Sequence, residues 1–218
     1  MSADMMNWVL LCGVFTVALI SPGPDFVMAV KNSILYSRRA GIFTAIGFSL
    51  GVVVHMVYTL AGLATLMLHV PLIFEIIKYA GAAYLIYVGI KSLRSTGFSE
   101  SRISVDGSQN INLPSLSGRS ALWSGFLTNV LNPKATLFFL AIFSQFITPQ
   151  TSWWIQGGYA LTCVVMTALW FSLVAMVLTH APVRQFFLSF SKWIDRVCGG
   201  LFILLGLKLA FTKGVLSS

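Results

Sequence analysis

The chain has 218 residues, of which 57% are hydrophobic and only 9% are charged. Soluble domains carry about 25% charged residues, so this chain has too few ionic groups to cover a water-exposed surface. The composition predicts an all-α, polytopic membrane protein. Its net charge of +8 comes from 14 basic and 6 acidic residues, which lie mainly in short loops between apolar runs. The positive-inside bias of membrane proteins explains this charge better than nucleic-acid binding does.

Three cysteines lie in apolar stretches, at Cys12, Cys163 and Cys198. No CxxC pair and no even framework is present, which argues against disulfides and against zinc ligation. We therefore expect packing roles for these residues, and neither a metal nor a cofactor.

Six apolar runs are long enough to cross a hydrocarbon core, which takes about 20 helical residues. They cover residues 7–30, 40–68, 71–93, 120–147, 153–181 and 190–211. The first run has no Lys or Arg ahead of it and is too long for a signal-peptide core, so we expect it to remain in the mature protein. The serine-rich segment 95–118 is predicted to be a cytoplasmic linker. It would join a first three-helix unit, residues 1–94, to a second, residues 119–218.

The basic residues divide unequally between the two predicted sides of the membrane, with ten on one side against three on the other. Cytoplasmic loops carry the excess of Lys and Arg. The loops after the first, third and fifth spans are therefore predicted to be cytoplasmic, and both termini to lie outside the cytoplasm.

The two halves resemble each other when the chain is shifted by 111 residues. The shift pairs Pro22 with Pro133, Gly47 with Gly158, His69 with His180, and Pro71 with Pro182. Because a unit of three spans ends on the opposite side from where it began, the second copy would be inserted upside down. Such a 3+3 inverted repeat is a recurring architecture of secondary transporters, with the substrate site near the midplane.

The first predicted span is interrupted by Pro22, Gly23 and Pro24, followed at once by Asp25. Each proline removes an amide donor, so the helix should kink or break there. A carboxylate within a span costs on the order of 2.5 kcal/mol or more and commonly marks an ion or substrate pathway. Asp25 can bind a substrate ammonium, carry a coupling proton, or form a salt bridge with Lys134.

The matching break in the fourth span lies between Asn129 and Lys134. Asn132 is suited to cap a restarted helix whose first residue is Pro133. That helix start, with Lys134, would attract an anionic group such as a carboxylate. Asp25 from one half and Lys134 from the other would match the two charges of a free amino acid. Equally, the two side chains can neutralise each other, and the sequence leaves both alternatives open.

The second span carries Gly47, Gly51 and His55 at intervals of four residues. They share one helix face, and the small residues favour close packing against another helix. His55 can serve as a proton relay or as a hydrogen-bond anchor.

Four separated motifs resemble the LysE/RhtB family of bacterial amino-acid exporters. They are SPGPDF at residues 21–26, RRAG at 38–41, AGAAYLIYVGIKSLRS at 80–95 and GFLTNVLNPKATLFF at 125–139. The resemblance implies efflux of amino acids or small amino-acid derivatives across the bacterial inner membrane, driven by proton antiport. The positions that match the family motifs are Pro22, Gly23, Pro24, Asp25, Asn132, Pro133 and Lys134.

The predicted protein is a transporter and not an enzyme. Its expected partners are an amino-acid substrate, the proton and membrane lipid, and a homodimer is compatible with the sequence. The alternative is a cation or metal exporter of related fold, although only Asp25 and His55 are metal-ligand types near the midplane. A thiol-redox carrier would need mirrored cysteine pairs, and Cys12, Cys163 and Cys198 are not mirrored.

Overall fold

The computed structural model describes residues 3–97, 115–148 and 150–212, and all regular structure within these ranges is helical. The helices are α1 (Ala3–Ile20), α2 (Pro24–Leu35), α3 (Arg38–His69), α4 (Pro71–Leu93), α5 (Gly118–Val130), α6 (Pro133–Phe146), α7 (Trp153–Val177) and α8 (Ala181–Phe211). Most of the predicted linker, residues 98–114, lies outside the described residues.

Two of the predicted spans are broken into helix pairs. The axes of α1 and α2 meet at 58°, and those of α5 and α6 meet at 56°. Pro24 and Pro133 are the first residues of α2 and α6, where a helix needs no amide donor from them. Both predicted interruptions are thus confirmed.

Three helices, α3, α4 and α7, are each long and apolar enough to cross a membrane. If each bent helix pair is counted as one further span, there are up to five candidate spans in the described part of the chain. Helix α8 is not among them, since its last 18 residues, 194–211, include three charged side chains, Asp195, Arg196 and Lys208. The chain is a helical, multi-pass membrane protein, whereas the six-span inverted repeat stays a prediction.

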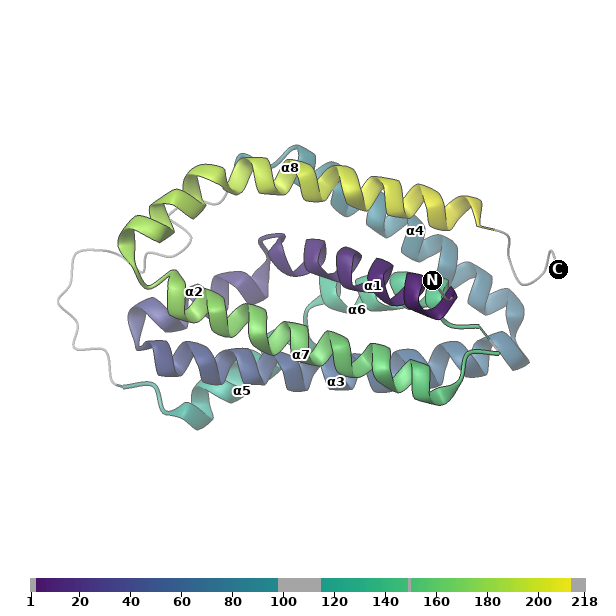
Figure 1. Ribbon diagram of the computed structural model, residues 1–218, viewed down its shortest axis with the longest axis horizontal. Coiled ribbons are helices and arrows are strands. Elements are labelled where there is room, and N and C mark those ends of the chain that lie inside the picture. Colours follow the sequence, from purple (N-terminus) through teal and green to yellow (C-terminus); the bar gives the residue numbers. More distant parts are fainter. Residues whose placement is uncertain (1–2, 98–114, 149, 213–218) are drawn as a thin grey trace.

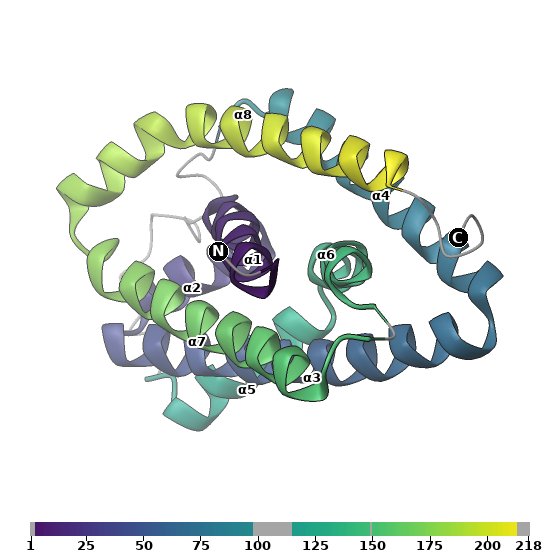
Figure 2. The ribbon, with the colours of Figure 1, turned by 45° about the vertical axis from the view of Figure 1, so that its right-hand side comes forward.

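The long helices surround the two short inner ones. Figure 2 shows α1 and α6 near the centre, with α3 and α7 below them and α4 and α8 above. The start of α1 and the end of α8 both lie toward the right of Figure 1. Buried aromatic side chains from the inner helices, including Phe15, Phe138 and Phe139, form part of the core. Within the two breaks, Ser21 and Asn132 are buried inside the helix assembly, whereas Leu131 is 74% exposed.

Glycines bring α3 very close to α5. A Cβ atom at Gly47 would overlap the carbonyl oxygen of Leu122, and one at Gly125 would overlap that of Thr44. The predicted packing face of Gly47 and Gly51 is confirmed, with α5 as its partner. This crossing fixes the position of Asn129 in the last turn of α5.

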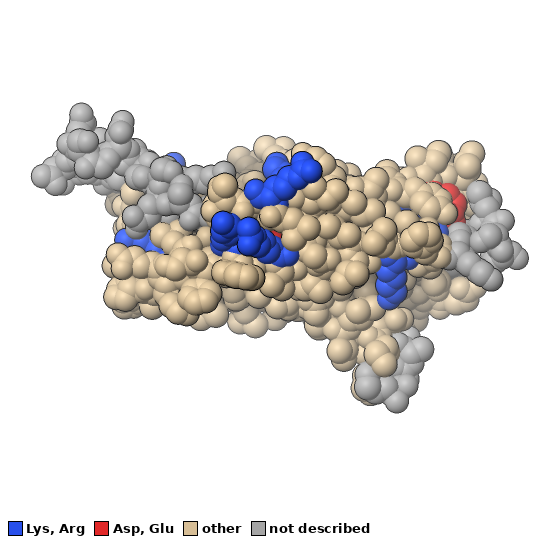
Figure 3. Space-filling model, turned by 90° about the horizontal axis from the view of Figure 1, so that it is seen from above, with Lys and Arg blue, Asp and Glu red and all other residues tan. Residues whose placement is uncertain are grey.

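Basic side chains gather where α8 begins. Arg38, at the start of α3, hydrogen-bonds to Thr179 and His180 just before α8, and the first half of α8 carries Arg184, Lys192 and Arg196. On the face seen in Figure 3, Lys and Arg atoms lie mostly toward the left and centre, with one further patch to the right. The orientation of the chain in the membrane remains a prediction.

Candidate functional site

A cavity opens at the two helix breaks and encloses about 540 Å³ of empty space, its mouth included. Most of its polar lining forms a group that we call the polar cluster: Ser21, Asp25, Asn129, Asn132 and Lys134. Most of the remaining lining is hydrophobic, and its principal members are Phe15, Leu19, Val52, Phe138, Phe139 and Phe171.

Asp25 accepts hydrogen bonds from two amides of the opposite half of the chain. The Nδ2 atom of Asn129 donates to Oδ2 over 2.7 Å, and that of Asn132 donates to Oδ1 over 3.2 Å. Asp25 also lies in the first turn of α2, where the helix dipole favours negative charge. The carboxylate is thereby held in place by neutral hydrogen-bond donors.

Lys134 is held by Ser21, the first residue of the first break. Its Nζ atom donates to the hydroxyl of Ser21 over 3.0 Å and to the Ser21 carbonyl over 3.3 Å. A Cβ atom at Gly23 would lie 3.4 Å from the same Nζ atom. Gly23 therefore leaves room beside the ammonium group that a larger residue would begin to fill.

Asp25 and Lys134 line one cavity but do not pair with each other. Among the residues that the structure describes, the ion pair closer than 4.0 Å joins Lys78 to Glu75 instead. Asp25 and Lys134 are each hydrogen-bonded to neutral groups of the polar cluster. The structure therefore does not contain the direct salt bridge between them that the sequence allowed. The two charges are available to a ligand that carries both signs.

Asn132 joins the two charged groups. It is the N-cap of α6, and its Oδ1 atom accepts a hydrogen bond from the backbone amide of Lys134 over 3.0 Å. Its Nδ2 atom faces Asp25 at the same time. One side chain thus serves the helix start and the carboxylate.

This double role predicts different effects for two substitutions of Asn132. Asn132→Ala should lower the free energy of unfolding by about 1 kcal/mol, because the cap of α6 is lost. Asn132→Ser should keep the cap and most of the stability, but it removes the amide that donates to Asp25. Thermal unfolding of the purified protein in detergent compares the two variants. Equal destabilisation by Ala and Ser would contradict the capping role.

His55 lies behind the cavity wall and is fully buried. Its Nε2 atom is 3.0 Å from the backbone carbonyl of Asn129. Because a carbonyl only accepts, Nε2 carries a hydrogen. The Nδ1 atom faces the hydroxyl of Tyr58, which can donate to a neutral ring or accept from a protonated one. The ring also packs on Phe139, with centroids 5.6 Å apart.

The structure brings most of the predicted site residues together. Gly23, Asp25, Asn129, Asn132 and Lys134 line the cavity. The three predicted prolines do not line it; they contribute by shaping the breaks, and their positions are Pro22, Pro24 and Pro133.

Sequence reasoning missed Ser21 and the aromatic lining. Ser21 immediately precedes the proline break, and a helix end leaves carbonyls without intrahelical partners. The position of Ser21 before the break could therefore have predicted a polar contact. The aromatic residues gave no such signal, because apolar residues fill every span.

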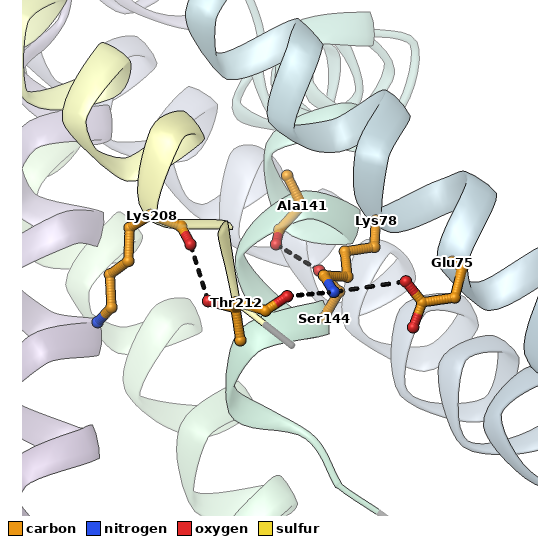
Figure 4. A network of polar contacts seen from close by, with 6 residues as sticks. All are labelled: Glu75, Lys78, Ala141, Ser144, Lys208 and Thr212. Carbon is orange, nitrogen blue, oxygen red and sulfur yellow. Dashed lines mark hydrogen bonds and ion pairs between the residues drawn. The ribbon is translucent and has the colours of Figure 1, made fainter. Parts of the chain in front are cut away.

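A second buried polar group lies outside the cavity, at the end of α8. The Nζ atom of Lys78, on α4, is 2.8 Å from the carbonyl oxygen of Thr212 and 3.4 Å from Oε2 of Glu75. Figure 4 shows Lys78 pointing between these two acceptors. A cation at a helix C-terminus is favourable, so Lys78 fastens the end of α8 to α4.

These features define a helical, multi-pass membrane protein whose cavity is lined by side chains of opposite charge. The LysE type translocator family model matches residues 16–213, and the chain belongs to this family. No solved structure matches the chain significantly.

Several curated proteins are similar over nearly the whole chain. The threonine efflux protein of Escherichia coli K12 is 31% identical over 209 residues, covering 96% of this chain and 100% of the relative. That of Salmonella typhimurium LT2 is 32% identical over the same shares. The leucine efflux protein of Salmonella choleraesuis is 34% identical over 140 residues, covering 64% of this chain and 62% of the relative.

Proposed function

We propose that this protein is a secondary transporter that exports amino acids or small amino-acid derivatives across the bacterial inner membrane. The observation that carries the proposal is the unpaired arrangement of Asp25 and Lys134 in one cavity. The names of the related threonine and leucine efflux proteins support the same substrate class.

The proposed binding mode uses the two charges separately. The substrate ammonium binds Asp25 and displaces an asparagine amide. The substrate carboxylate binds Lys134, where the start of α6 adds partial positive charge. Gly23 leaves the approach to Lys134 open. A zwitterion satisfies both partly buried charges at once, whereas a simple cation leaves Lys134 without a counter-charge.

In the proposed transport cycle the two three-helix units move against each other, so that the cavity opens to one side of the membrane at a time. Comparable bends of 58° and 56° at repeat-related prolines support an inverted repeat with the substrate at its junction. In this scheme the chain lies with both termini in the periplasm.

Efflux from vesicles tests the proposal. The purified protein is reconstituted, the vesicles are loaded with labelled threonine or leucine, and release is followed with and without an imposed proton gradient. We expect release above that of protein-free vesicles. Release should be faster when the proton gradient is directed into the vesicles, opposite to the movement of the substrate. Release equal to that of protein-free vesicles for a full panel of amino acids would reject transport, and indifference to the gradient would reject proton antiport.

Proton coupling is proposed for Asp25 and His55. His55 contacts the carbonyl of Asn129, whose side chain bonds to Asp25, so a change of charge on one group reaches the other through a single residue.

His55→Gln should uncouple transport without abolishing substrate binding. Glutamine keeps a donor for the Asn129 carbonyl but cannot take up a proton. We expect proton-driven efflux to fall about tenfold, equivalent to about 1.4 kcal/mol, while exchange of labelled for unlabelled substrate continues. Equal loss of both activities would show that His55 is structural.

A further inference from the structure

We infer that the cavity selects neutral amino acids with an apolar side chain and rejects those with a charged side chain. This inference rests on the proposed function, since it concerns the substrate of the same site. Its basis is the separation of the polar cluster from the aromatic lining along α1 and α6.

The polar cluster is one connected group. Asn129 and Asn132 donate to Asp25, Asn132 caps the amide of Lys134, and Lys134 donates to Ser21. The α-ammonium and α-carboxylate of a bound amino acid engage the two charges of this cluster. A third charge on the substrate would need a partner elsewhere in the cavity.

The lining next to the polar cluster is aromatic. Phe138 follows Lys134 by one turn of α6, about 6 Å along the axis, and Phe15 precedes Ser21 on α1 by about 9 Å. The rings of Phe15 and Phe138 are 6.1 Å apart, and that of Phe139 is 5.6 Å from Phe15. The substrate side chain therefore extends from the charges toward packed rings.

Thr167, on α7, is the polar residue of the lining outside the polar cluster. It is 1% exposed, and its hydroxyl donates to the carbonyl of Cys163 over 2.8 Å. The hydroxyl can still accept a hydrogen bond, but it carries no charge. A lysine or glutamate side chain would lose its water at this end of the cavity without gaining an opposite charge.

Competition measurements in reconstituted vesicles test the inference. Labelled leucine is exchanged against unlabelled leucine, norvaline, lysine or glutamate. We expect leucine and norvaline to compete similarly, and lysine and glutamate to compete about 100-fold more weakly, as the cost of an uncompensated charge implies. If lysine or glutamate competes as well as leucine, the inference is wrong while the proposed function stands. If no amino acid exchanges at all, the proposed function itself fails.

A substitution of Thr167 tests which part of the cavity contacts the side chain of the substrate. Thr167→Asp places a carboxylate beside the aromatic lining, and we expect lysine to gain at least about tenfold relative to leucine. Thr167→Asn is the matched neutral control and should give lysine no such advantage. A folded Thr167→Asp variant without the gain, or an equal gain with Thr167→Asn, would overturn the assignment. If Thr167→Asp does not fold, the wild-type competition series decides.

Discussion

Asp25→Asn is expected to lower amino-acid efflux by at least about 30-fold. The substitution keeps the size of the side chain and removes its charge. In the proposed complex Asp25 pairs with the substrate ammonium, and truncating one partner of such a hydrogen-bonded charge pair costs about 2–5 kcal/mol, which corresponds to a factor of about 30 or more. Asparagine at this position also accepts hydrogen bonds from Asn129 and Asn132 less well, because an amide has one acceptor oxygen where the carboxylate has two. Initial rates of labelled efflux, normalised to the amount of reconstituted protein, measure the effect.

Lys134→Met should cause a loss of similar size. Methionine fills much of the same space but offers neither the ammonium charge nor a donor to Ser21. Since the two groups bind opposite ends of one substrate, the double variant should be little worse than either single variant. Unchanged efflux of every substrate in both single variants would rule out this cavity as the binding site.

Glu75→Gln is the control for removal of a buried carboxylate. Glu75 lies outside the cavity, and Lys78 keeps its bond to the Thr212 carbonyl when Glu75 is neutral. Efflux by this variant should stay within about twofold of the wild type, a change of well under 1 kcal/mol. A loss as large as that of Asp25→Asn would mean that efflux responds to buried charge in general.

Gly47→Ala should destabilise the protein markedly. Its new methyl group would overlap the Leu122 carbonyl and lie 2.7 Å from the backbone amide of Phe126. Neither contact can be relieved by turning a side chain, so α3 and α5 would have to separate. Overpacking of this kind costs about 1–3 kcal/mol or more. A fall in the apparent melting temperature in detergent, with earlier loss of a single size-exclusion peak, is the expected result.

Gly62→Ala, on the same helix, provides the matched control. Apart from its chain neighbours and the nearby backbone of α3, no atom of the described residues would lie within 4 Å of its Cβ, and alanine favours a helix over glycine by about 1 kcal/mol. This variant should melt at the wild-type temperature or above it. If the two variants melt together below the wild type, helix packing at Gly47 is not the cause of the loss.

The helix breaks could be predicted from sequence because they follow from local chemistry. Proline at Pro24 and Pro133 cannot continue a preceding helix but can begin a new one, and Asn132 is a preferred N-cap. The same rules placed Asp25 and Lys134 beside the breaks. Whether these two charges pair depended on competing neutral partners from other helices, which no local rule supplies.

Contacts between distant helices account for what the sequence left undecided. The packing face of α3 was visible in the spacing of Gly47 and Gly51, but its partner α5 was not. The aromatic lining was hidden because Phe15 and Phe138 differ in no local way from lipid-facing residues. The extent of α8 was also underestimated, since the sixth span was predicted to begin at residue 190 and the helix begins at Ala181.

Asn129 is held on three sides. Its side-chain amide binds Asp25, its backbone carbonyl receives His55, and its side-chain oxygen lies where Gly51 would otherwise carry a Cβ atom. An arriving ammonium group that takes the place of this amide must release the asparagine side chain against the backbone of α3. In the proposed binding mode, a single residue, Asn129, thus couples occupancy of the cavity to the close crossing of α3 and α5.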